Sequence, residues 1–180
     1  MLVLATALAV PSLFAASSAE AAGVATCPAG DSRMHGLESW NPPLIRRGSP
    51  KKTRPTITIG ATKLVNCRNG GVKSGTLSAK IRWLDPGNCD TLFMYREGEA
   101  FPRITGTVSI TWNTKETSTA SVTVARNKAY VQPLEGAVTK GKFTGSKFSV
   151  WLLIKPANGA CSSRDMHSTK FQSLTALRIN

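Results

Sequence analysis

Apolar and polar residues alternate along most of the chain after Pro55, and this period-two pattern limits what the chain can fold into. Clear examples run from Leu77 to Trp83, from Ile104 to Trp112 and from Phe148 to Ile154. Alternation places successive side chains on opposite faces of a strand, and turn-forming residues separate the runs. Because no later stretch shows the apolar spacing of an amphipathic helix, the sequence predicts an all-β domain.

We expect residues 56–180 to form an antiparallel β-sandwich of eight or nine strands, of the Ig-like or Greek-key type. A small β-barrel is the alternative. Trp83 and Trp112 fall in phase with the apolar positions of their runs, which predicts that both lie in the core. The antibody-type signature does not fit, because Cys67 and Cys89 lie too close in sequence to Trp83.

The chain has four cysteines, which are widely separated and form no C-x-x-C pair, so zinc and redox motifs are not indicated. Two structural disulfides are expected. Of the three possible connectivities we favour Cys27 with Cys67 and Cys89 with Cys161, because sequential pairing ties the N-terminal segment to the domain. Each bridge would stabilise the fold by about 3 to 4.5 kcal/mol in the chain-entropy model.

Residues 1–21 have the features of a signal peptide, with an apolar run from Leu2 to Phe14 and an Ala19-Glu20-Ala21 cleavage pattern. No cation precedes Arg33, whereas signal peptides normally begin with one. We expect a secreted or envelope-associated protein without a membrane span in the mature chain. The alternatives are an uncleaved apolar helix and lipidation at Cys27, which would leave three thiols.

Charge indicates the kind of partner. The chain has 23 Lys and Arg against 10 Asp and Glu, a net charge of +13, and the leader holds Glu20 but no cation. A strongly basic exported chain favours anionic surroundings, such as an envelope polymer or an acidic polysaccharide, and a protein partner is possible. Nucleic acid is not the expected partner, because the sequence contains no recognised reading module or aromatic stacking platform beside the cations.

Residues 22–55 contain five prolines and no sustained periodicity, which predicts an irregular basic arm. Within it lies a cluster of cations that we expect to form a flexible, solvated loop and to bind the anionic partner. These candidate binding residues are Arg46, Arg47, Lys51, Lys52 and Arg54.

Catalytic candidates are few, since the chain has only two histidines. His167 shares one polar loop with Ser162 and Asp165, but triad members normally come from separate elements, which favours a solvated histidine. The acids Asp85, Asp90, Glu97 and Glu99 could supply a glycosidase pair or calcium ligands, yet they lie in predicted turns and loops. We therefore predict no catalytic residue, metal site or cofactor. Phe93 and Tyr95 are the expected exposed aromatic residues.

The segments Trp83–Cys89, Ile110–Trp112 and Gly136–Gly145 resemble those of small exported β-sandwich proteins of actinobacteria, over roughly residues 60–180. The resemblance implies compartment and fold, and it supplies no catalytic residues. With the charge, it leads us to expect a secreted, non-enzymatic module that binds an anionic envelope or extracellular polymer. The alternatives are a small secreted hydrolase using acids between Asp85 and Glu99, and a protease-inhibitor-like domain that presents Ser162 to His167.

Overall fold

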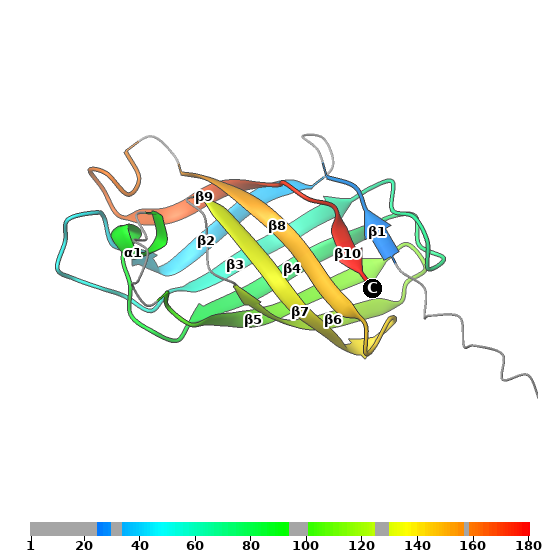
Figure 1. Ribbon diagram of the computed structural model, residues 1–180. Helices are drawn as coiled ribbons and strands as arrows, with labels where there is room; N and C mark the ends of the chain where they lie inside the picture. The colour runs from blue at the N-terminus through cyan, green and yellow to red at the C-terminus, as the bar shows by residue number, and fades with distance from the viewer. Residues whose placement is uncertain (1–24, 30–33, 94–100, 125–129, 157–158) are drawn as a thin grey trace, which may run out of the picture.

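Strands dominate the computed structural model, which describes residues 25–29, 34–93, 101–124, 130–156 and 159–180 (Figure 1). One short helix, α1 (Cys89–Phe93), accompanies ten strands among these residues. The strands are β1 (Ala25–Cys27), β2 (His35–Leu44), β3 (Thr56–Leu64), β4 (Gly75–Trp83), β5 (Ile104–Trp112), β6 (Thr117–Val124), β7 (Val131–Gly141), β8 (Lys147–Pro156), β9 (Met166–Ser173) and β10 (Leu177–Ile179). The all-β prediction is confirmed.

The sheet closes on itself. Its order is β1-β10-β8-β7-β6-β5-β4-β3-β2-β9, and every pairing is antiparallel. An additional pairing of β9 with β8 closes the eight strands from β8 to β9 into a barrel, and β10 and β1 continue the sheet beyond β8. The β-sandwich expectation is therefore wrong, and the small barrel is the better description. Alternation reports which face of each strand is buried, and that pattern is the same whether a sheet packs on a second sheet or closes on itself.

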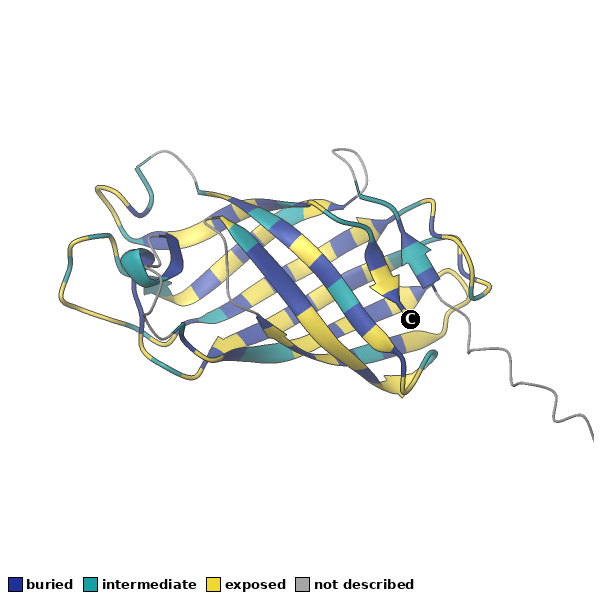
Figure 2. Ribbon diagram, viewed as in Figure 1, coloured by how far each residue is buried: buried dark blue, intermediate teal, exposed yellow. Residues whose placement is uncertain are grey.

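Alternation also explains how the barrel is filled, since buried and exposed residues alternate along much of the wall, most regularly in β4, β5 and β6 (Figure 2). The inward residues form one continuous core that includes Trp83 and Trp112, which are 1% and 2% exposed. Gly136 shows how closely the strands approach, because a Cβ atom there would overlap the carbonyl oxygen of Ser121. The prediction that both tryptophans lie in the core is confirmed.

The segment 22–55 is not irregular throughout, contrary to the sequence-based expectation. β2 forms part of the barrel wall between β3 and β9, and β1 pairs with β10. The prolines Pro42 and Pro43 lie where the pairing of β2 with β9 shifts register between Ser39 and Leu44. A proline has no N–H to donate, so a strand tolerates it where the pairing is interrupted by a bulge. The number of prolines in this segment therefore led to the wrong prediction that it contains no strand.

The two disulfides of the structure join Cys27 to Cys67 and Cys89 to Cys161, which are the favoured pairings. They lie at opposite ends of the barrel. Cys89 begins α1, at the end that we call the α1 end, whereas Cys27 ends β1, at the end that we call the Cys27 end (Figure 1). Two disulfides are consistent with an oxidising, extracellular environment. Among the described residues, no helix has the length and apolar character needed to cross a membrane.

Candidate functional site

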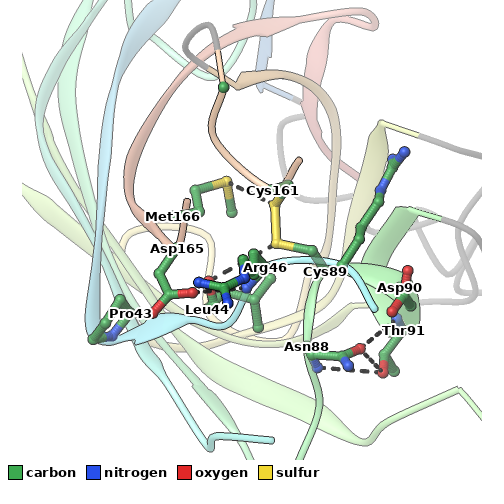
Figure 3. The surroundings of a disulfide bond; sticks show 12 residues. Pro43, Leu44, Arg46, Asn88, Cys89, Asp90, Thr91, Cys161, Asp165 and Met166 are labelled. Atoms are coloured by element: carbon green, nitrogen blue, oxygen red, sulfur yellow. Dashed lines mark hydrogen bonds between the residues drawn. A yellow bond between two sulfur atoms is a disulfide. The ribbon is translucent and has the colours of Figure 1, made fainter. Parts of the chain in front are cut away.

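The cationic cluster lies in residues 45–55, which connect β2 to β3 at the α1 end, and the backbone of this connection is held by hydrogen bonds. Asp165 Oδ1 accepts from the Arg46 N–H at 2.9 Å (Figure 3), and Asp90 Oδ2 accepts from the Gly48 N–H at 2.8 Å. The Arg47 N–H donates to the Cys161 carbonyl at 3.0 Å. Groups distant in sequence thus satisfy part of the loop backbone, and the expected flexibility of the loop stays a prediction.

Three of the five cations project from this fixed backbone into solvent. Arg46, Lys51 and Lys52 are exposed, and their side chains have no hydrogen-bond or ion-pair partner within the described part of the chain. Neither of the two salt bridges found there, Arg103–Asp85 and Lys142–Glu116, involves the loop. Because Asp90 and Asp165 accept hydrogen bonds from backbone N–H groups, the structure fixes the loop without pairing its three exposed cationic side chains.

The other two cations are partly engaged within the protein. Arg54 is exposed, but its Nε donates to the Leu84 carbonyl at 3.0 Å. Arg47 is half-buried, its Nη2 donates to the Tyr130 hydroxyl at 3.4 Å, and its guanidinium lies 5.9 Å from the centre of the Phe93 ring. The five candidate residues therefore do not form one equivalent set.

Phe93 and Tyr130 pack together beside Arg47, with ring centres 4.8 Å apart and planes inclined at 31°. A pocket of about 280 Å³ opens here, and the described residues that line it are Arg47, Phe93, Tyr130, Pro156, Gly159, Ala160, Cys161 and Ser162. The sequence-based expectation for Phe93 is wrong, because this side chain is 5% exposed. Tyr95 lies outside the described residues.

The acids proposed for hydrolysis have structural partners where they can be followed. Asp85 accepts from the Arg103 side chain at 2.9 and 3.0 Å and from the Arg103 N–H at 2.9 Å. These hydrogen bonds lower the pKa of Asp85 to about 2, which suits a permanent anion and not a general acid. Glu97 and Glu99 lie outside the described residues, so the acid pair stays a prediction.

The segment proposed for protease inhibition is not a single loop, because Met166 and His167 already belong to β9. His167 is exposed, and with Asp165 and Ser168 it lines a hollow of about 250 Å³. Within the described residues, the side-chain hydrogen bond of Asp165 runs to the Arg46 backbone and not to His167. The arrangement thus does not reproduce the base and orienting acid of a triad.

Sequence reasoning missed a group of polar side chains inside the barrel. Glu38 and Gln132 are fully buried, and neither their side-chain oxygens nor the Gln132 amide nitrogen has a hydrogen-bond partner in the structure. The indole nitrogens of Trp40 and Trp83 are also buried and have no hydrogen-bond partner among the described residues, and the two rings pack edge to face with their centres 6.2 Å apart. Burial raises the pKa of Glu38 to about 8. A signal was available, because Glu38 lies two residues before Trp40 and shares its face of the strand.

The chain matches no protein-family model, no curated protein and no solved structure, so the geometry described above is the basis for assigning a function.

Proposed function

We propose that this protein is an exported, non-enzymatic binding module that associates with an anionic envelope or extracellular polymer through its β2–β3 loop. One observation carries the proposal: Arg46, Lys51 and Lys52 are exposed, and their side chains have no partner among the described residues, on a loop whose backbone is held by hydrogen bonds. A fixed backbone lowers the conformational entropy lost when the loop binds. Arg54 lies on the same loop and contributes the charge that its bond to Leu84 leaves unneutralised.

The net charge of +13 supports the same partner class, because a basic protein concentrates polyanions at its surface. The proposal includes cleavage of residues 1–21 and export of the mature chain. The two disulfides support export. The resemblance to exported actinobacterial proteins stays a hypothesis.

The test compares two triple variants of equal charge. Arg46→Gln/Lys51→Gln/Lys52→Gln removes the exposed loop cations, and Lys63→Gln/Lys80→Gln/Lys140→Gln removes three exposed cations from the barrel wall. Binding to immobilised polygalacturonate is measured at about 50 and 300 mM salt, with neutral dextran as the control polymer.

We expect the loop variant to bind about 10- to 100-fold more weakly at low salt, since each cation near an anionic surface contributes about 1 kcal/mol or less. The wall variant should lose much less affinity. Equal losses would show that only overall charge matters, and the loop assignment would then be wrong.

A further inference from the structure

Arg46 and Arg47 are neighbours in sequence with opposite environments, and this contrast points to a second binding site. The Arg46 side chain is exposed, whereas Arg47 turns toward Phe93 and Tyr130. Its Nε atom is buried and has no hydrogen-bond partner in the structure. Arg47 also lines a pocket, so its guanidinium is held against two aromatic rings at a defined position beside that pocket, in contrast to the charge of an exposed arginine.

The pocket beside Arg47 lies at the mouth of the barrel. Pro156 ends β8, Tyr130 directly precedes β7, and Cys161 is joined by its disulfide to the first residue of α1. Mouths of β-barrels are common positions for small-molecule sites. A volume of about 280 Å³ is near the lower end of the range for such sites, so it suits a ligand of about one ring.

Hydrogen bonds join the loop at Arg47 to both cysteines of the disulfide beside the pocket. The Arg47 N–H donates to the Cys161 carbonyl at 3.0 Å, and the Cys89 N–H donates to the carbonyl of Ile45, two residues before Arg47, at 2.8 Å. Tyr130 is held against Phe93 by ring packing. A preformed site of this kind loses little conformational entropy on binding.

The lining chemistry selects the ligand class. Arg47 supplies a cationic fork, and the hydroxyl groups of Tyr130 and Ser162 are further donors. A carboxylate matches a planar guanidinium and two hydroxyl donors better than a neutral amide does. Pro156 and Ala160 add apolar wall, which suits a ring or a short carbon chain attached to that carboxylate.

We propose that this pocket binds a small organic carboxylate, with its charged group on Arg47 and its ring or chain against Tyr130, Pro156 and Ala160. The site does not rest on the proposed polymer binding, because it uses Arg47 and none of the exposed loop cations.

The test titrates the full oxidised chain with benzoate and follows the Arg47 side-chain Nε–H signal and backbone amide signals by NMR. Benzamide, which has the same shape without the charge, and inorganic phosphate are the comparison probes. We expect millimolar affinity for benzoate, as befits a ligand of this size, and at least tenfold weaker binding of the other two. Equal binding of benzamide or of phosphate would overturn the proposal.

Matched variants assign the effect to Arg47. Arg47→Gln should weaken benzoate binding at least tenfold, and Arg46→Gln, which removes the same charge one residue away, should leave it unchanged. Arg47→Lys keeps the charge and offers a second test if Arg47→Gln does not fold; it should also weaken binding, because it lacks the fork. Equal losses at positions 46 and 47 would refute the site.

Polymer binding by the loop and carboxylate binding by the pocket can be tested independently. The loop triple variant should lose polygalacturonate binding and keep benzoate binding, whereas Arg47→Gln should do the reverse. Loss of benzoate binding in the loop triple variant would overturn the pocket assignment without affecting the polymer result.

Discussion

Each end of the barrel contains a buried tryptophan, and the two ends differ in whether the indole N–H has a hydrogen-bond partner. Trp83 ends β4 and Trp112 ends β5, and because these strands are antiparallel the two indoles lie at opposite ends. At the Cys27 end, Trp112 Nε1 donates to Ser118 Oγ at 2.8 Å, and Ser118 in turn donates to the Lys142 carbonyl. At the α1 end, Trp83 Nε1 is buried and has no hydrogen-bond partner in the part of the chain that the structure describes.

This contrast separates a structural end from a candidate functional one. A satisfied polar network rigidifies its surroundings, whereas unpaired buried groups lower stability and are retained where another demand outweighs that cost. The exposed loop cations and the Arg47 pocket are both at the α1 end, with the unpaired indole. We therefore expect changes at the Cys27 end to alter stability alone and changes at the α1 end to alter binding as well.

Glu38 gives the largest predicted effect, and it tests whether the polar interior lowers stability. Its pKa rises from 4.5 to about 8 on folding because burial disfavours the anion. The contribution of Glu38 to the free energy of unfolding should therefore be fully present below pH 4.5, fall as pH rises to about 8, and then level off, with a total change of up to about 5 kcal/mol. Urea unfolding followed by tryptophan fluorescence measures this. Glu38→Gln should remove most of the fall.

Asp85→Asn is the control for that experiment. Hydrogen bonds from Arg103 lower the pKa of Asp85 from 3.8 to about 2, so its contribution is present above pH 3.8 and is lost as pH falls through about 2. This variant should leave the profile between pH 4.5 and 8 unchanged. A Glu38→Gln protein with the wild-type slope would show that Glu38 does not titrate inside the barrel.

The disulfides give the next largest effect and compare the two ends directly. Cys27–Cys67 and Cys89–Cys161 span 40 and 72 residues, so replacing either pair with alanine should lower the free energy of unfolding by about 4 kcal/mol. Benzoate binding should distinguish the two disulfide variants. Loss of Cys89–Cys161 should abolish benzoate binding under conditions where the variant is still folded, whereas loss of Cys27–Cys67 should preserve it. Similar binding losses would refute the division of roles between the two ends.

Features set by local pattern could be predicted from the sequence. The strands that contain Trp83 and Trp112 follow from alternation, since burial on one face leaves a period of two. The disulfide pairing followed from the position of Cys27 in an N-terminal segment that needed an attachment to the domain. Both are consequences of chain connectivity and periodicity.

Features set by pairing between distant segments could not be predicted. Closure of the barrel depends on β2 with β9 and β8 with β9, and no periodicity within one strand specifies its neighbour. The difference between Arg47 and the exposed cations of the loop has the same origin, because the Arg47 side chain donates a hydrogen bond to Tyr130, which lies 83 residues away in sequence. Charge density alone makes Arg46 and Arg47 equivalent, and only the fold separates them.

The smallest predicted effect concerns the two tryptophans themselves. Trp83→Phe and Trp112→Phe remove the same volume, so the difference between them isolates the indole N–H. Trp112→Phe loses a buried hydrogen bond and should lower the free energy of unfolding by about 1 kcal/mol more than Trp83→Phe, which removes an unpaired donor.

Ser118→Ala should lower the free energy of unfolding by about 1 to 3 kcal/mol, because it leaves the Trp112 N–H and the Lys142 carbonyl without their partner. In the Trp112→Phe background that cost should shrink, since one of the two groups is already gone. Urea unfolding of the three single variants and the Trp112→Phe/Ser118→Ala double variant measures these differences. All four are compared at the same pH, chosen outside the range in which Glu38 titrates. Equal costs for the two Trp→Phe changes would mean that Trp83 finds a partner in solution, and the α1 end would then be as well satisfied as the Cys27 end.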